Sequence, residues 1–166
     1  MGLAIIFAVA VTVAAVGTRE SRSAASWLTV TGPDRAIVVR WPVDEGATFV
    51  LRYRNSLYGS LAEERFVVQG GEMVLVGLAA DEVAVLDEYY RTNRPARRGP
   101  ESGERTWSAG PAQAVRLPEL HVAATDLGRR TLLIPGRPAV ELWRFVDDRS
   151  PTVTLRVESL GDDPAS

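Results

Sequence analysis

Two polar residues, Asn55 and Glu64, stand where an alternating apolar pattern predicts side chains that face a protein core. An amide or carboxylate on such a face costs free energy unless it is hydrogen-bonded, so polar residues there need a structural or functional reason. Tyr53 and Ser56 flank Asn55 and add a phenol and a hydroxyl group. We therefore take Tyr53, Asn55, Ser56 and Glu64 as the candidate binding residues.

Three roles are open to these residues. A carboxyl group on an apolar face is protonated more easily than one in water, so Glu64 could serve as an acid or a base in a small hydrolase. Ser56 could be its nucleophile, but no GxSxG sequence surrounds Ser56, and nothing in the spacing joins it to His121, the only histidine. Alternatively, Asn55 and Glu64 satisfy backbone groups of the loop between them. We expect a binding or structural role and keep hydrolysis by Ser56 or Glu64 as the alternative.

The composition argues against several kinds of site. Cysteine is absent, which removes disulfides, thiolate metal sites and a cysteine nucleophile. The chain also lacks HExxH, EF-hand, Walker A and dinucleotide-binding motifs, and His121 lies on a predicted strand where it faces outward. We expect no metal and no cofactor. The formal net charge of −2 gives no global field that attracts nucleic acid, so we expect no nucleic-acid partner.

Alternating apolar and polar residues predict strands on both sides of the loop that carries the candidate residues, in segments 48–54 and 65–68. Short apolar runs separated by Gly and Pro continue through the rest of the chain. We expect one strand at 36–41, ended by Pro42, and another at 140–146, and only 79–90 could contain a helical turn. We expect an all-β fold, an antiparallel sandwich or barrel of about nine short strands. One N-terminal hydrophobic helix would precede it.

The strand register would decide which candidate residues meet. An antiparallel register that pairs Tyr53 with Phe66 brings two large side chains together on the apolar face. The same register sets Asn55 opposite Glu64 at the mouth of the loop. We expect these two residues to be direct neighbours.

The N-terminal run 2–17 carries no charged side chain and only one polar one, Thr12. Its length lies between a signal-peptide core and a membrane-spanning helix. Charged residues follow it before any cleavage site with small residues, which favours an uncleaved anchor. We expect residues 1–25 to hold the chain in the cytoplasmic membrane, with cleavage and secretion as the alternative. Arg19 and Arg22 taken alone would favour a cytoplasmic location for the domain.

At 166 residues the chain supports one domain of ordinary size, which we assign to 26–160, followed by a flexible tail at 161–166. Residues 91–111 hold three Pro, three Gly and five Arg, and we expect a long loop or flap there. Three of its residues, Arg94, Arg97 and Arg98, are candidates for an anion-binding or partner-binding loop. The simpler interpretation is a solvated loop whose charge nearby glutamates offset.

The sequence Tyr53-Arg54-Asn55-Ser56, followed by Glu64-Arg65-Phe66, resembles the core of a bacterial family known as domain of unknown function 1850. In that family a strand ends in Tyr-x-His-Ser, and a Glu precedes an aromatic residue after a polar loop of the same length. The resemblance covers most of residues 28–158. Asn55 stands where the family has His, so a proton-transfer or metal role of that His would not carry over.

The resemblance implies a small protein with an N-terminal hydrophobic segment, encoded beside tripartite ATP-independent periplasmic transporters. On this basis we expect a non-enzymatic, membrane-anchored β-module on the extracytoplasmic side of the cytoplasmic membrane. It would act as an accessory or binding protein of such a transporter. Its partners would be the membrane, through the N-terminal helix, and a transporter membrane subunit or solute receptor.

Overall fold

The computed structural model describes residues 26–90, 96–98 and 105–159. The predicted anchor helix in residues 1–25, Arg94 of the predicted anion loop and the predicted tail at 161–166 lie outside these ranges. Within the described ranges, no helix is long and apolar enough to cross a membrane.

Twelve strands lie within the described residues, together with one α-helix and one short 3₁₀ helix. The strands are β1 (Ser26–Thr31), β2 (Ile37–Val43), β3 (Thr48–Arg54), β4 (Leu61–Gln69), β5 (Glu72–Ala80), β6 (Arg97–Arg98), β7 (Trp107–Ala109), β8 (Val115–Leu117), β9 (Glu119–Ala123), β10 (Thr131–Leu133), β11 (Val140–Glu141) and β12 (Thr152–Ser159). The helices are α1 (Val83–Tyr90) and the 3₁₀ helix η1 (Leu142–Phe145).

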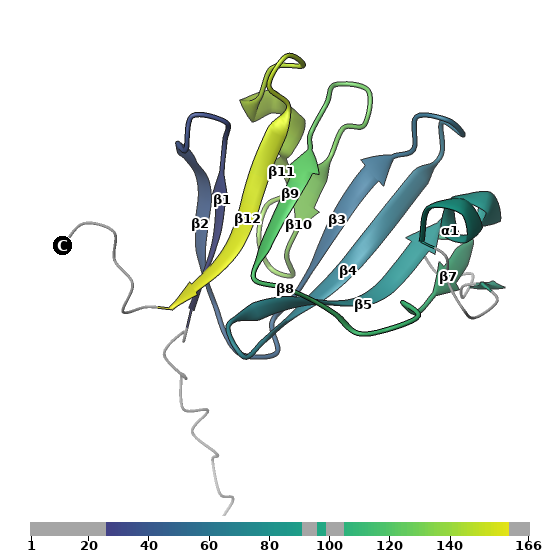
Figure 1. Cartoon of the computed structure of the whole chain (residues 1–166), viewed down its shortest axis with the longest axis horizontal. Coiled ribbons are helices and arrows are strands. Elements are labelled where there is room, and N and C mark those ends of the chain that lie inside the picture. Colours follow the sequence, from purple (N-terminus) through teal and green to yellow (C-terminus); the bar gives the residue numbers. More distant parts are fainter. Residues whose placement is uncertain (1–25, 91–95, 99–104, 160–166) are drawn as a thin grey trace, which may run out of the picture.

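The strands pair antiparallel in two sheets (Figure 1). The smaller sheet has the order β2-β1-β12-β9, and the larger has the order β11-β10-β3-β4-β5-β7-β6, with β8 paired to β5. The chain crosses from the larger sheet to the smaller twice, between β8 and β9 at Pro118 and again between β11 and β12. The prediction of an all-β antiparallel fold is confirmed, although the strands are more numerous than expected.

One apolar core joins the two sheets. The smaller sheet contributes Leu28, Val30 and Leu155, and the larger contributes Phe49 and Phe66. Each of these five side chains is at most 2% exposed. Because residues of both sheets fill one cluster, the sheets form two layers around a shared core. The ring centroids of Phe49 and Phe66 lie 5.0 Å apart in a stacked pair, which couples β3 to β4 inside this core.

A smaller apolar cluster lies where α1 covers β5. It includes Val85 and Leu86 of the helix, Leu78 of β5 and Tyr53 at the end of β3. Val85 and Leu86 are both fully buried and pack in this cluster from the helix. The helical alternative for residues 79–90 is therefore confirmed for α1. Trp107 of β7 also packs against this cluster.

The predicted register of β3 and β4 is wrong. Tyr53 pairs with Ala62 and Leu51 pairs with Glu64, so Asn55 does not lie opposite Glu64. The chain turns earlier than expected because the Asn55 N–H donates to Ser60 O at 2.8 Å, which closes a short loop. The observed register is shifted by four residues from the predicted one. Because four is an even number, each side chain keeps the face that the alternating pattern assigned to it.

Two further predictions fail. Segment 91–111 is not only a loop, because it contributes β6 and β7, and β7 pairs with β5. The strand expected at 140–146 stops after Glu141 and continues as η1. Its partner β10 begins at Thr131, directly after the β9–β10 turn, and antiparallel pairing of residues beyond Glu141 would need a strand before Thr131.

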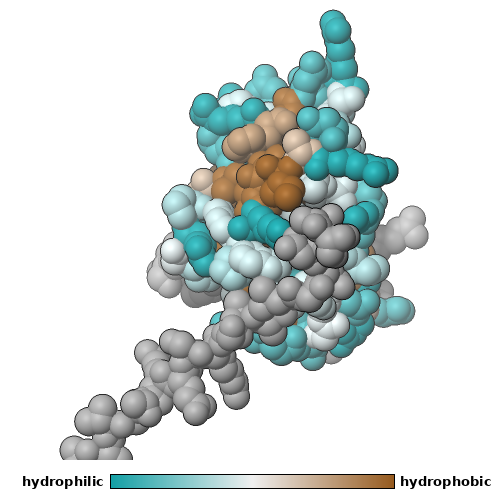
Figure 2. Space-filling model, turned by 90° about the vertical axis from the view of Figure 1, so that its left-hand side faces the viewer, coloured by the Kyte–Doolittle hydropathy of each residue, from teal (hydrophilic) through white to brown (hydrophobic). Residues whose placement is uncertain are grey.

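The edge strand β2 borders an apolar part of the surface. Figure 2 views the molecule from the side on which β2 lies and shows apolar atoms exposed there. Ile37 of β2 is 55% exposed. The strand continues through Pro42, where we expected it to end, because an edge strand tolerates a residue without a backbone N–H.

Candidate functional site

The four predicted binding residues line one open hollow of about 370 Å³ between the β3–β4 loop and the β9–β10 turn. The sequence-based grouping of these residues is thus reproduced, although their predicted pairing is not. The lining residues are Tyr53, Arg54, Asn55, Ser56, Glu64, Ala123, Thr125, Leu127, Gly128 and Arg130.

Asn55 holds the β3–β4 loop in shape. Its side chain is buried, and its Oδ1 accepts hydrogen bonds from the backbone N–H groups of Leu57 and Tyr58, each at 3.0 Å. Its backbone oxygen accepts a further hydrogen bond from Gly59, which has φ +65°. Asn commonly forms such a turn because its short amide reaches the backbone two or three residues ahead. The structural alternative for Asn55 therefore accounts for its burial.

Glu64 points to the core side of β4, as its position in the alternating pattern predicts, and its side chain is 15% exposed. Its Oε2 lies 3.3 Å from Nη1 of Arg130, which is 19% exposed. The Arg130 guanidinium also lies over the Tyr53 ring, 4.5 Å from its centroid. A carboxylate with little exposure is stable when a cation offsets the loss of hydration, and Arg130 supplies that cation.

Arg130 is held in place by the β9–β10 turn. Its Nε donates to the backbone oxygen of Ala123 at 3.1 Å. The turn itself is closed by Gly128, whose N–H donates to Thr125 Oγ1 at 3.0 Å, and Gly128 O accepts from the Arg54 N–H at 2.7 Å. The turn and the end of β3 are therefore hydrogen-bonded to each other, and both carry residues of the hollow.

Sequence reasoning missed Arg130. It is one of nineteen basic residues, and no local motif distinguishes it. The only indication of such a residue was indirect. A carboxylate predicted on an apolar face needs a cationic partner from elsewhere in the chain.

The hollow contains no nucleophile–base pair among the residues that the structure describes. Ser56 is exposed, and His121 lines a different hollow on the smaller sheet, where its Nδ1 lies 3.0 Å from Thr154 Oγ1. His121 is 61% exposed, so its predicted outward orientation is confirmed, and its Nε2 contacts the Glu119 carboxylate. In the described part of the chain, no group of three or more His, Asp or Glu side chains is placed to hold a metal ion.

The predicted anion loop lies apart from this hollow. Arg97 and Arg98 form β6 at the edge of the larger sheet, and both are exposed. Because consecutive strand residues point to opposite faces, these two arginines do not form one cluster. Arg97 instead lines a second hollow together with Arg65.

Comparisons with protein-family models, with curated proteins and with solved structures found no significant match to this chain.

Proposed function

We propose that the domain is a non-enzymatic binding module that receives a polar group of a partner protein or ligand in the hollow beside the β3–β4 loop. The observation that carries the proposal is the position of Arg130, which contacts Glu64 and covers Tyr53 at the wall of an open hollow. The arrangement presents guanidinium, carboxylate, aromatic and hydroxyl groups on rigid strands, which suits recognition of a polar surface.

Binding fits these residues better than hydrolysis. The Glu64 carboxylate is in an ion pair with Arg130, so its Oε2 is already engaged by a guanidinium group of the protein. Asn55 Oδ1 is engaged by two backbone N–H groups of its own loop. Ser56 at the rim offers a hydroxyl group that can hydrogen-bond to a partner without being activated as a nucleophile.

The resemblance and the apolar run at residues 2–17 support a proposal for the cellular role. We propose that the chain belongs with the family known as domain of unknown function 1850 and that residues 1–25 anchor it in the cytoplasmic membrane. The β domain would then lie on the extracytoplasmic side, as an accessory of a tripartite-type solute transporter. Its partner would be the transporter membrane subunit or the solute receptor.

Co-purification tests this proposal. The tagged full chain is extracted in mild detergent from cells that also contain the transporter encoded beside it, and the recovered transporter subunits are quantified. Ser56→Trp should reduce recovery because an indole at the rim obstructs the hollow. Ser150→Trp is the matched control, because Ser150 is also exposed but lies at another hollow. Equal recovery with both variants, or no recovery with the unmodified chain, would count against the proposal.

The alternative, a small extracytoplasmic hydrolase, makes a separate prediction. Glu64→Gln should then abolish hydrolysis of at least one ester, peptide or glycoside substrate that the unmodified chain cleaves. Mass spectrometry of the mature amino terminus distinguishes a retained anchor from a cleaved and secreted form.

A further inference from the structure

A second polar cluster lies on the outer face of the larger sheet, opposite the core. Its centre is Glu63, which neighbours Glu64 on β4 and therefore points to the other face. The Glu63 side chain is only 8% exposed, because Arg52, Arg65 and Arg105 surround it with nitrogen–oxygen distances of 3.0, 3.3 and 3.7 Å. Arg105 also pairs with Asp81 at 3.0 Å.

The strand register extends this cluster toward the sheet edge. Glu63 pairs with Ala79, Ala79 with Ser108, and Ser108 with Arg97. Residues directly opposite each other in neighbouring strands share a face. Arg97 therefore lies on the same outer face as the Glu63 cluster, with only small side chains between them.

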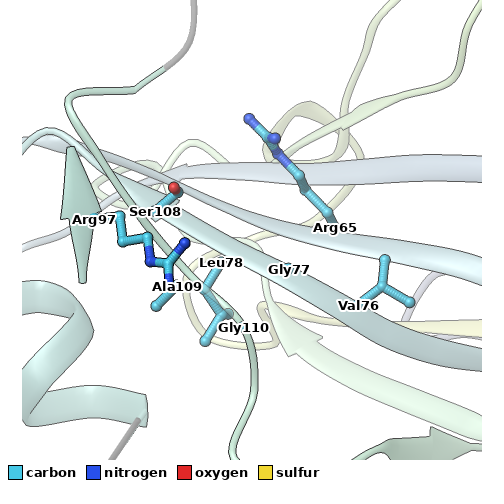
Figure 3. A pocket seen from close by; sticks show the side chains of 8 residues that line it. All are labelled: Arg65, Val76, Gly77, Leu78, Arg97, Ser108, Ala109 and Gly110. Atoms are coloured by element: carbon cyan, nitrogen blue, oxygen red, sulfur yellow. The ribbon is translucent and has the colours of Figure 1, made fainter. Parts of the chain in front are cut away.

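Those small residues leave a trough of about 460 Å³ along β5. Gly77 forms part of its floor, and Figure 3 shows Arg65 rising from β4 and Arg97 reaching from β6 on the two sides of β5. A β-bulge between Arg65 and Phe66 leaves Val76 as the extra residue of β5, 50% exposed beside the trough. Bulges of this kind often re-aim a side chain next to a binding site.

Among the residues that the structure describes, positive charges outnumber negative ones around the trough. Arg52, Arg65 and Arg105 share the carboxylates of Glu63 and Asp81. Arg97 has no carboxylate partner among the residues that the structure describes. A guanidinium group that faces a hollow without a counter-charge attracts an anion, and the fork of donors on Arg suits a carboxylate.

We propose that this trough binds an organic carboxylate with a short aliphatic body, held between Arg65 and Arg97. The two arginines supply charge from opposite walls, and the Ser108 hydroxyl adds a polar contact at the edge. Val76 lines the trough with apolar surface, which contacts the aliphatic part of the ligand. Because Arg65 and Glu64 point to opposite faces of β4, this site is separate from the hollow proposed above for partner binding.

Glutarate is a suitable probe, because its two carboxylates are joined by a short aliphatic chain. Titration calorimetry of the purified full chain in detergent should show saturable glutarate binding, and inorganic phosphate should bind more weakly because it lacks the aliphatic part. Arg97→Gln should weaken glutarate binding about tenfold, as expected for the loss of one charge-assisted contact. Arg98→Gln is the matched control, since it makes the same charge change on the adjacent residue and opposite face.

Gly77→Val tests the shape of the trough without changing its charge. A Cβ at Gly77 would lie 3.6 Å from Arg65 Cβ, an ordinary contact, so the added side chain occupies the floor without a backbone clash. We expect glutarate binding to be lost at an unchanged melting temperature. Absence of saturable glutarate binding, equal effects of Arg97→Gln and Arg98→Gln, or equal affinity for phosphate and glutarate would each overturn the proposal. None of these results bears on recovery of the transporter through the other hollow.

Discussion

The Arg130 guanidinium lies 3.3 Å from the Glu64 carboxylate, although 66 residues separate the two in the chain. The contact joins the segment that leads into β10 to the middle of β4, across the intervening strand β3. It places a cation and an anion of low exposure beside the β3–β4 loop. The candidate site is therefore also a structural connection within the larger sheet.

Replacement of Arg130 should destabilise the domain. In Arg130→Met, Glu64 keeps its charge at a site of 15% exposure but loses this cationic partner. Because both partners retain some contact with water, we expect a loss of about 2 kcal/mol in the free energy of unfolding, below the range for fully buried pairs. Urea denaturation followed by circular dichroism measures it.

The double variant Arg130→Met/Glu64→Gln separates charge from packing. If Arg130 stabilises the domain mainly through this ion pair, the double variant should lose less unfolding free energy than the two single variants lose in sum. Strict additivity would show that Arg130 acts through its contacts with Tyr53 and Ala123 instead.

Asn55→Ala should loosen the β3–β4 loop. The variant removes the acceptor for the N–H groups of Leu57 and Tyr58. We expect a loss of about 1–2 kcal/mol in unfolding free energy, because the amide is buried and two donors lose a partner. Asn55→Asp keeps an oxygen acceptor at this position and should lose less, as denaturation of both variants in parallel would show. Equal losses for both would indicate that the amide nitrogen matters more than the oxygen.

The sequence predicted the faces of the strands better than their pairing. Alternation assigns a side to each residue of β3 and β4, and burial of Phe49, Tyr53 and Phe66 on one side agrees with it. Register depends on where the loop closes, and that is decided by the hydrogen bonds of Asn55 rather than by the apolar pattern. The register shift of four residues therefore changed which residues of β3 and β4 are paired, but not the face on which each side chain lies.

Features that depend on distant strands were hidden from the sequence. β7 forms in a Pro- and Gly-rich segment because β5 offers it a partner, and η1 replaces a predicted strand because β10 begins only at Thr131. Arg130 is likewise positioned by the β9–β10 turn, which no local pattern links to Glu64. The sequence thus indicated four residues that line one hollow, but it did not indicate Arg130, the cation that pairs with Glu64.

Engineered disulfides can test the register of β3 and β4. The chain has no cysteine, so each introduced pair is unambiguous. Thr48 and Val67 are direct partners, and Thr48→Cys/Val67→Cys should oxidise readily because opposed strand residues lie within disulfide reach. Val50→Cys/Gln69→Cys matches the register first expected from the sequence and should stay reduced. Thiol counting after mild oxidation distinguishes the two, and the reverse pattern would contradict the observed pairing.

Glu63→Gln should lower the free energy of unfolding more than the loss of an exposed ion pair would. Its carboxylate lies within 4 Å of Arg52, Arg65 and Arg105, so its loss leaves three guanidinium groups close together with less negative charge between them. We expect a loss of about 2 kcal/mol in unfolding free energy, partly restored at high salt because ions screen the repulsion.

Glu72→Gln is the control, since Glu72 pairs with Arg116 at 3.4 Å with side chains 36% and 49% exposed. That variant should lose at most about 0.5 kcal/mol. Similar losses for both variants in urea denaturation would show that Glu63 contributes no more than a surface charge.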